Sequence, residues 1–234
     1  MLKKLGVFAL TMILALGMAA CGGKDDADGE VTFTDATAQS DAADNAGEET
    51  QPDAGNDADS NTVLEENTTG LHHIEIEVQG YGTIYCELDE NVAPITVQNF
   101  LELAQAGFYD GLTFHRVVEG FVIQGGDPIG NGTGGSEQNI VGEFSVNGYN
   151  NTLSHTRGVL SMARAMDYNS ASSQFFIMHQ DATYLDGQYA AFGYVTEGMD
   201  VVDAIVANTP VQDIQSGFVA QENQPVITKI TVVD

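Results

Sequence analysis

The chain has 234 residues and a formal net charge of -27, from 34 acidic and only 7 basic side chains. Binding along a nucleic-acid backbone needs clustered lysine and arginine, so this charge balance excludes nucleic acid as a partner. Of the two cysteines, Cys86 lies in an apparent strand, where it is expected to be a small buried hydrophobe. Cys21 belongs to a different pattern.

The first 21 residues have the pattern of an export signal. Two lysines, Lys3 and Lys4, precede an apolar run from Leu5 to Ala20. This run is shorter than a helix that crosses a bilayer, which needs about 20 residues. The small residues before Cys21 resemble the lipobox of bacterial lipoproteins, although Met18 stands where leucine is usual. This resemblance implies that Cys21 is lipidated and anchors the chain to the cell membrane, with the remainder on the extracytoplasmic side. Ordinary signal cleavage and an uncleaved anchor are the alternatives.

Residues 22–70 have the composition of a disordered tether. They hold 14 acids and one lysine and have few apolar side chains. Such a segment cannot bury enough surface to offset chain entropy, and its charges repel one another. The acids do not have the spacing of a calcium loop, so no metal site is predicted there.

Residues 71–234 have mixed composition and suffice for one domain with a sizeable core. Leu71 to Val78 alternates apolar and polar side chains and predicts a half-buried strand; a turn and a second strand, Thr83 to Leu88, follow. Asn91 to Gly107 predicts a helix, because Pro94 lies near its first turn and its apolar residues recur at helical spacing.

The next stretch, Phe114 to Asp127, has strand-like residues at both ends, with a turn at Glu119-Gly120 and a Gly-Gly break near its end. Arg116 lies among apolar residues, where a guanidinium keeps its charge and offers five donors. Pairing with one of the many carboxylates is its ordinary alternative role. The glycine-rich run Gly130 to Gly135 lacks the Lys-Ser/Thr ending of a phosphate loop and is interpreted as a flexible loop.

Further strands are predicted at Thr156 to Ala163, Gln174 to Met178 and Val226 to Val233, and a second helix at Met199 to Ala207. In the strand after Gln174, Phe175 and Phe176 should face opposite sides of the sheet. In a closed antiparallel barrel with a helix over each open end, every strand would be paired on both sides and the apolar face of each helix would be buried. Patterning alone does not separate this barrel from a sandwich.

Three ordered blocks resemble the cyclophilins, the peptidyl-prolyl cis/trans isomerases. The first is FHRVVEGFVIQGGD at 114–127, and the second is GVLSMA at 158–163. The third is SQFFI at 173–177, followed by YLDG at 184–187 and FG at 192–193. Over residues 71–234 the resemblance implies a mainly β fold, a closed eight-stranded antiparallel barrel capped by two α-helices. It also implies an enzyme without a cofactor or metal that accelerates Xaa–Pro rotation in unfolded or exported proteins.

The resemblance also implies roles for individual residues. Arg116 would donate to the imide nitrogen, Gln124 would bond the substrate carbonyl, and His115 would help to shape the site, although a histidine there is more often structural. Apolar side chains would line the proline pocket, with valine at 122 where methionine is common: Phe121, Val122, Phe176 and Leu185. Ala163 and Arg164 would flank the peptide backbone, with Arg164 replacing a common asparagine. Tyr184 and Tyr189 replace a tryptophan and a histidine of the best-known eukaryotic pattern.

Rotation about an amide makes and breaks no bond, which fits a chain without an evident nucleophile or metal cluster. Two other classes of function stay open from the sequence. One is a non-catalytic module on the cell surface that binds proline peptides, and the other is an acidic spacer with a purely structural domain. A donor aimed at the imide nitrogen favours the enzyme, since a pure binder has no use for it. The high net charge disfavours self-association, so a monomer is expected.

Overall fold

The structure is a computed structural model and describes residues 70–234. The predicted signal peptide 1–21, the lipid site Cys21 and all but the last residue of the predicted tether 22–70 lie outside the described residues. Residues 70–234 contain no helix that is long and apolar enough to cross a membrane.

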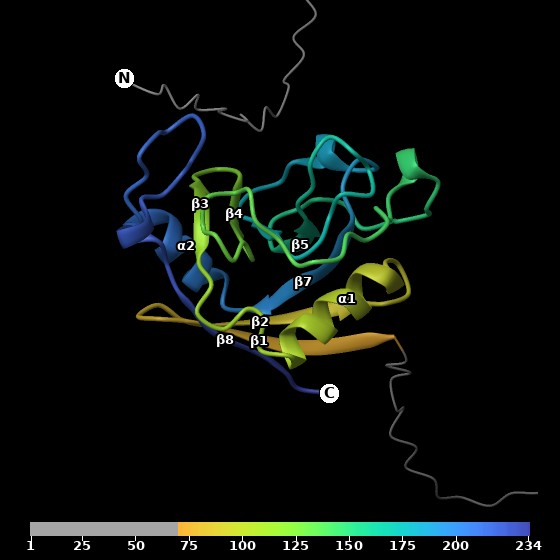
Figure 1. Cartoon of the computed structure of the whole chain (residues 1–234), viewed down its shortest axis with the longest axis horizontal. Coiled ribbons are helices and arrows are strands. Elements are labelled where there is room, and N and C mark those ends of the chain that lie inside the picture. Colours follow the sequence, from red (N-terminus) through yellow and green to blue (C-terminus); the bar gives the residue numbers. More distant parts are fainter. Residues whose placement is uncertain (1–69) are drawn as a thin grey trace, which may run out of the picture. The chain divides into compact units, whose positions relative to one another are not determined.

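Eight strands form one antiparallel sheet in the order β3-β4-β6-β5-β7-β2-β1-β8 (Figure 1). The described part of the chain is thus mainly β, as the sequence predicted. The strand bounds are β1 Leu71–Val78, β2 Gly82–Asp89, β3 Phe114–Val118, β4 Val122–Gly125, β5 Val159–Met162, β6 Phe175–Met178, β7 Ala191–Glu197 and β8 Ile227–Val232.

The sheet is an open half-barrel, so the prediction of a closed barrel is wrong. Strands β3 and β8 stand at the two ends of the strand order, and no ladder joins them. In place of a ladder, two isolated bridges join this edge to the residues before β8, one from Thr113, just before β3, to Val226 and one from Arg116 to Phe218. Pro225 has no N–H to donate, and a short 3-10 helix, Gln221–Asn223, precedes it, so the strand pairing does not continue here.

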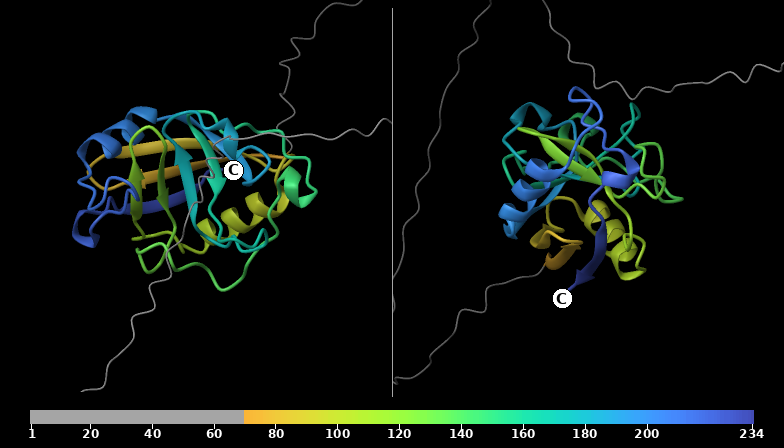
Figure 2. Two further views of the ribbon diagram at one scale, coloured as in Figure 1. Left: turned by 90° about the horizontal axis from the view of Figure 1, so that it is seen from above. Right: turned by 90° about the vertical axis from the view of Figure 1, so that its left-hand side faces the viewer.

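Two α-helices cover the sheet, α1 Pro94–Gln105 and α2 Met199–Asn208. Helix α1 packs against β8 and β2, and α2 packs against β2 and β3. Figure 2 shows the two helices on different sides of the strands. Helix α1 begins at Pro94 rather than at the predicted Asn91, which fits the preference of proline for the first turn.

The apolar side chains divide into two clusters. The main core joins the helices to the sheet and contains the fully buried Phe100, Phe175 and Phe192. The second apolar cluster contains Val122, Val159, Ala163, Phe176, Met178, Ala182, Leu185 and Ala191, with Phe121, Leu153 and Tyr189 packed against it. Phe175 and Phe176 belong to different clusters, which confirms that they face opposite sides of β6.

Candidate active site

Arg116 lies on β3 beside the second apolar cluster, and its hydrogen-bond partners are neutral. Its Nε donates to the carbonyl oxygen of Ser216 at 2.7 Å, and one Nη donates to Oε1 of Gln124 at 3.2 Å. Within residues 70–234 no carboxylate lies within ion-pair distance of Arg116, whereas Arg157 pairs with Asp203 at 2.8 Å. A guanidinium has five N–H donors, so three stay available for a ligand. Among the described residues, Arg116 therefore does not form the ordinary Arg–acid pair that was its alternative role.

Gln124 holds the guanidinium from the neighbouring strand, because Arg116 and Gln124 are partners in the β3–β4 register. The Gln124 Nε2 donates to Gln174 Oε1 at 2.9 Å, and the Gln174 Nε2 donates to the carbonyl oxygen of Gly134 at 2.7 Å. A row of neutral amides therefore connects Arg116 to the glycine-rich loop. A substrate carbonyl would have to use the remaining N–H of Gln124.

The side chains that were expected to hold the proline ring lie together in the second apolar cluster. Val122, Phe176 and Leu185 are buried there, each no more than 6% exposed, and Ala163, which was expected to flank the peptide backbone, is buried beside them. Phe121 is partly exposed and lies between two other candidates, under the Arg116 guanidinium at 5.6 Å and stacked on Tyr184 at 6.4 Å. The cluster offers an apolar surface with a cationic donor at its edge.

Arg164 stacks against three aromatic rings. Its guanidinium carbon lies 5.1 Å from the ring centroid of Phe144, 5.0 Å from that of Tyr168 and 4.7 Å from that of Tyr189. Its Nε and one Nη donate to the carbonyl oxygen of Gln188 at 3.0 and 2.8 Å. Since Tyr189 packs edge-on against Phe176, Arg164 braces one wall of the cluster.

A buried polar group lies behind Phe176, and the sequence did not predict it. The ring of His155 stacks on Phe176 at 6.1 Å, while its Nδ1 and Nε2 lie 2.8 Å from Asp186 and 3.0 Å from Ser161. Burial lowers the pKa of His155 against the opposing effect of Asp186, so the ring is neutral near pH 7. The position of His155 just before the 158–163 block was its only sequence signal.

His115 lies next to Arg116 on β3 but is fully buried. Neither ring nitrogen has a hydrogen-bond partner within residues 70–234, and the ring centroid lies 6.2 Å from that of Phe218. Burial lowers the pKa of His115 to about 4, with Asp127 opposing and Arg116 reinforcing this shift. A direct contact between this ring and a substrate would require a rearrangement, so the predicted contribution of His115 is to the shape of the site.

Asp127 organises the glycine-rich loop that the sequence suggested was flexible. Its carboxylate accepts backbone N–H groups from Ile129, Asn131 and Gly132 at 2.6 to 3.0 Å. Burial opposes ionisation of Asp127, but these backbone donors and that of Gly134 outweigh it and lower the pKa. Asp127 therefore anchors the loop that contains Gly134, whose carbonyl oxygen accepts the last hydrogen bond in the row of amides.

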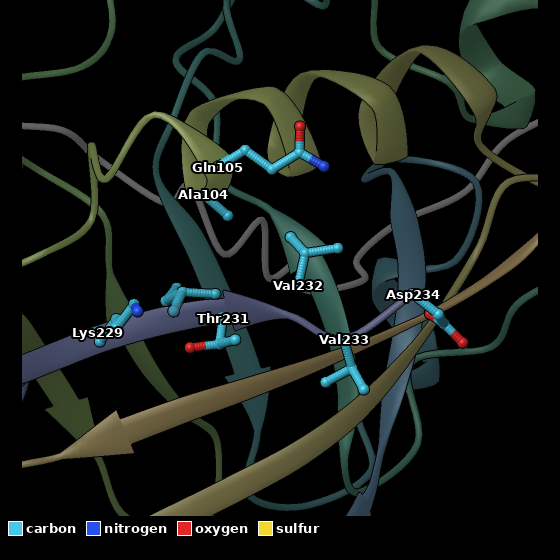
Figure 3. A pocket seen from close by; sticks show the side chains of 8 residues that line it. Ala104, Gln105, Lys229, Thr231, Val232, Val233 and Asp234 are labelled. Carbon is cyan, nitrogen blue, oxygen red and sulfur yellow. The ribbon is translucent and has the colours of Figure 1, made fainter.

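A separate shallow pocket of about 350 Å³ lies between the end of α1 and β8, away from all of these residues. Figure 3 shows its lining, which includes Gln105, Lys229 and Asp234. None of the candidate site residues takes part in it. Among residues 70–234 no group of three His, Cys, Asp or Glu side chains could hold a metal ion.

The arrangement can therefore bind an apolar ring and aim a cationic donor at an atom beside it. All eight substrate-binding candidates and two of the three catalytic ones, Arg116 and Gln124, lie in or around the second apolar cluster. His115 lies behind Arg116, and Cys21 is outside the described residues. Their individual roles stay predictions.

Comparisons with known proteins agree with this geometry. A family model described as "Cyclophilin type peptidyl-prolyl cis-trans isomerase/CLD" matches residues 73–232. Peptidyl-prolyl cis-trans isomerase-like 1 of Rhizopus delemar is 48% identical over 122 residues, 52% of this chain and 72% of that protein. Peptidyl-prolyl cis-trans isomerase B of Bacillus subtilis is 49% identical over 114 residues, 49% of this chain and 76% of that protein.

One solved structure is a cyclophilin type peptidyl-prolyl cis-trans isomerase of Cryptosporidium parvum, crystallised in the presence of the dipeptide Ala-Pro. It is similar with a TM-score of 0.61 and 32% identity, and the match covers 69% of this chain and 99% of that one. The matched family model spans more than half of the chain and includes both the sheet and the candidate site. The chain belongs to the cyclophilin-type peptidyl-prolyl cis-trans isomerase family.

Proposed function

We propose that this chain accelerates cis–trans rotation about Xaa–Pro bonds, with Arg116 as the donor to the imide nitrogen. The observation that carries this assignment is a half-buried guanidinium at the edge of an apolar cluster, with no carboxylate partner among residues 70–234. Membership of a family of prolyl isomerases supports the reaction, and the dipeptide named with the Cryptosporidium parvum relative supports a proline-containing substrate.

The chemistry requires only differential binding. Amide resonance sets a rotation barrier of about 18–20 kcal/mol, and uncatalysed isomerisation takes about tens to hundreds of seconds. At the twisted transition state the nitrogen lone pair is no longer delocalised, so a hydrogen bond to it is stronger than in either planar isomer. Lowering the barrier by about 7 kcal/mol would accelerate rotation about 10⁵-fold.

The second apolar cluster would hold the proline ring while the rest of the amide turns. The cluster contains the buried side chains Val122, Phe176 and Leu185. Phe121 and Tyr189 are partly exposed, so these two rings can contact a proline that enters from solvent. The neutral partners of Arg116 orient the guanidinium without neutralising its charge. Its remaining N–H groups are the donors available to the substrate.

The test is the cis-to-trans rate of an Xaa–Pro peptide with the purified full-length chain and with Arg116→Ala. We expect the wild-type chain to accelerate the reaction and the variant to lose about 10²–10³-fold in kcat/KM, as for removal of a charge-stabilising donor. Arg157→Ala is the matched control, because this arginine pairs with Asp203 and should leave the rate unchanged. Full activity in Arg116→Ala would remove this mechanism, and peptide binding without turnover would favour the proline-peptide binding module.

We further propose that a lipid on Cys21 holds the enzyme at the extracytoplasmic face of the cell membrane, where it acts as a monomer on exported proteins. The basis is the leader sequence that ends at Cys21 and the acidic segment that follows it. Fractionation of cells that express the wild-type chain or Cys21→Ala tests the anchor. We expect membrane association to require Cys21, and a variant that stays at the membrane would contradict the proposal.

A further inference from the structure

The segment between α2 and β8 contains a closed loop that the sequence did not mark. This seam loop, residues 211–219, is closed at its base by a bridge between Val211 and Val219 and by the Gln212 N–H donating to Phe218 O at 2.8 Å. Asp213 accepts the backbone N–H groups of Gln215 and Ser216, both at 3.2 Å. The loop therefore has a defined internal structure.

The seam loop contacts β3 on both sides of Arg116. The Val117 N–H donates to Gly217 O at 2.8 Å, and the Val219 N–H donates to His115 O at 3.0 Å. Between these two bonds, the Arg116 Nε donates to Ser216 O at 2.7 Å. The same short segment thus fixes the backbone of β3 and the base of the guanidinium group.

Gly217 makes this close approach feasible. Its φ is +73°, and a Cβ there would lie 2.6 Å from the carbonyl oxygen of Val117 and in collision with the Val118 side chain. A larger residue would push the loop away from β3 and shift the carbonyl of Ser216, which is the adjacent residue. Gly80 has a similar φ of +77° but no neighbouring atom within 4 Å of a Cβ.

We propose that the seam loop is a positioning element of the isomerase site, in which the Ser216 carbonyl orients the Arg116 guanidinium. With Nε held by Ser216 and one Nη held by Gln124, two bonds fix the plane of the group, and the free N–H groups keep a constant direction. This inference rests on the proposed role of Arg116. A guanidinium held only by Gln124 would turn about that bond.

The kinetic test is a double-mutant cycle in the full-length chain with Gly217→Ala and Arg116→Lys. If the loop acts through Arg116, Gly217→Ala lowers kcat/KM about 10–100-fold in the wild-type background, since a misplacement of about 1 Å costs this much. In the Arg116→Lys background the same change has an effect of about twofold or less. Gly80→Ala, which shares the positive φ without the collision, leaves kcat/KM unchanged.

A second readout does not depend on activity. The chain has three arginines, Arg116, Arg157 and Arg164, so a ¹H–¹⁵N spectrum of the Nε–H groups holds three signals, assignable with Arg→Lys variants. The Arg116 signal should be protected from solvent exchange in the wild-type chain and lose protection in Gly217→Ala. The Arg164 signal, whose Nε donates to Gln188 O, should keep its protection. If Gly217→Ala does not fold, Asp213→Ala loosens the same loop from its exposed side.

The outcomes separate the two proposals. Full activity in Arg116→Lys and in Arg116→Ala would overturn the role of Arg116 itself. A different result would overturn only the positioning role of the loop. In that case both Arg116 variants lose activity, while Gly217→Ala keeps the Arg116 Nε signal of the wild type and has the same rate as Gly80→Ala. Equal effects of Gly217→Ala in both backgrounds would make the loop a structural element only.

Discussion

Arg116 shows how a half-buried cation can be held without being neutralised. Burial lowers the pKa of Arg116 against the opposing effects of Tyr189 and Tyr184, yet the group stays protonated at neutral pH, since a free guanidinium is a very weak acid. Its acceptors are an amide oxygen and a backbone carbonyl, which orient a charge but do not cancel it. A carboxylate in either place would compete with the substrate for the donor.

Gln124→Glu tests this point with a change of one atom. The new carboxylate would form a charge-assisted bond to Arg116 and draw the guanidinium away from the substrate. We expect kcat/KM to fall about 10–100-fold at neutral pH while the thermal midpoint changes little. Gln98→Glu, on the exposed face of α1, is the isosteric control. Unchanged activity in Gln124→Glu would mean that catalysis does not require Arg116 to be free of a carboxylate partner.

His115 leads to a prediction about stability rather than activity. Its pKa is about 4 in the folded chain and about 6.5 when unfolded, so between these values the unfolded state binds the extra proton. Stability should therefore fall as the pH is lowered from 6.5 to 4, by about 3 kcal/mol from this residue. Denaturant unfolding of wild type and His115→Phe at pH 7 and pH 4 measures the difference. An equal pH dependence in both would refute the assignment.

The sequence could identify most side chains of the site but not what orients them. The three cyclophilin-like blocks contain Arg116, Gln124 and Phe176, and the structure brings these residues together. The carbonyl of Ser216 has no sequence signal, because any residue supplies a backbone oxygen and only the fold brings it to Arg116. The contact between His155 and Phe176 is likewise a product of tertiary packing.

At the scale of elements, helix α1 depends on a cap from far along the chain. The residue before the helix, Ala93, has no capping side chain. Instead the buried Glu143 accepts the N–H groups of Ile95 and Thr96 at 3.1 and 2.7 Å, and also the Thr96 hydroxyl at 2.7 Å. A carboxylate at a helix N-terminus satisfies free donors and complements the helix dipole.

Glu143→Ala should lower the free energy of unfolding by about 2–4 kcal/mol, because it removes the cap and leaves buried N–H groups without a partner. Glu143→Gln keeps one acceptor and the volume, and should lose about half as much. Glu102→Gln, on the exposed part of the same helix, should change stability by less than about 0.5 kcal/mol. Denaturant unfolding compares the three variants, and equal stabilities for Glu143→Ala and Glu102→Gln would exclude the capping role.

The elements themselves were predictable where the pattern is local. Strand β1 has the predicted bounds, Leu71–Val78; from Ile74 to Val78 its apolar residues are buried and alternate with more exposed glutamates, as the sequence pattern indicated. Strand β7 was missed by patterning, since its buried part is Ala191-Phe192-Gly193 and its remainder is mostly exposed. The prediction of a closed barrel was wrong at the edge between β3 and β8. Whether these strands pair depends on residues 209–226, and their irregular structure has no periodic signal in the sequence.

At the scale of the molecule, the charge of the folded part sets the field that a substrate meets. Residues 71–234 contain 20 acids but only four bases, and Arg157 is already paired with Asp203. The field should favour the approach of cationic peptides and oppose that of anionic ones, an effect that salt screens over about 10 Å at 0.1 M.

Peptides that differ only in flanking residues test this field. At low ionic strength, kcat/KM for an Xaa–Pro peptide flanked by lysines should exceed that for one flanked by glutamates by about 10-fold or more. The ratio should approach one in about 1 M salt, where the Debye length is about 3 Å. A ratio that salt does not change would point to a specific contact instead of the overall charge.

The open edge between β3 and β8 has an evolutionary consequence. Since the loop at this edge is joined to β3 by a few bonds and not by a full ladder, its length and sequence can vary while the strand pairings stay the same. Variation there would alter the direction of the Arg116 donor as long as Val211 and Val219, which pack with the main core, are kept. The fold thus separates the segment that orients the donor from the strands that keep the protein folded, and libraries confined to residues 212–218 would exploit that modularity.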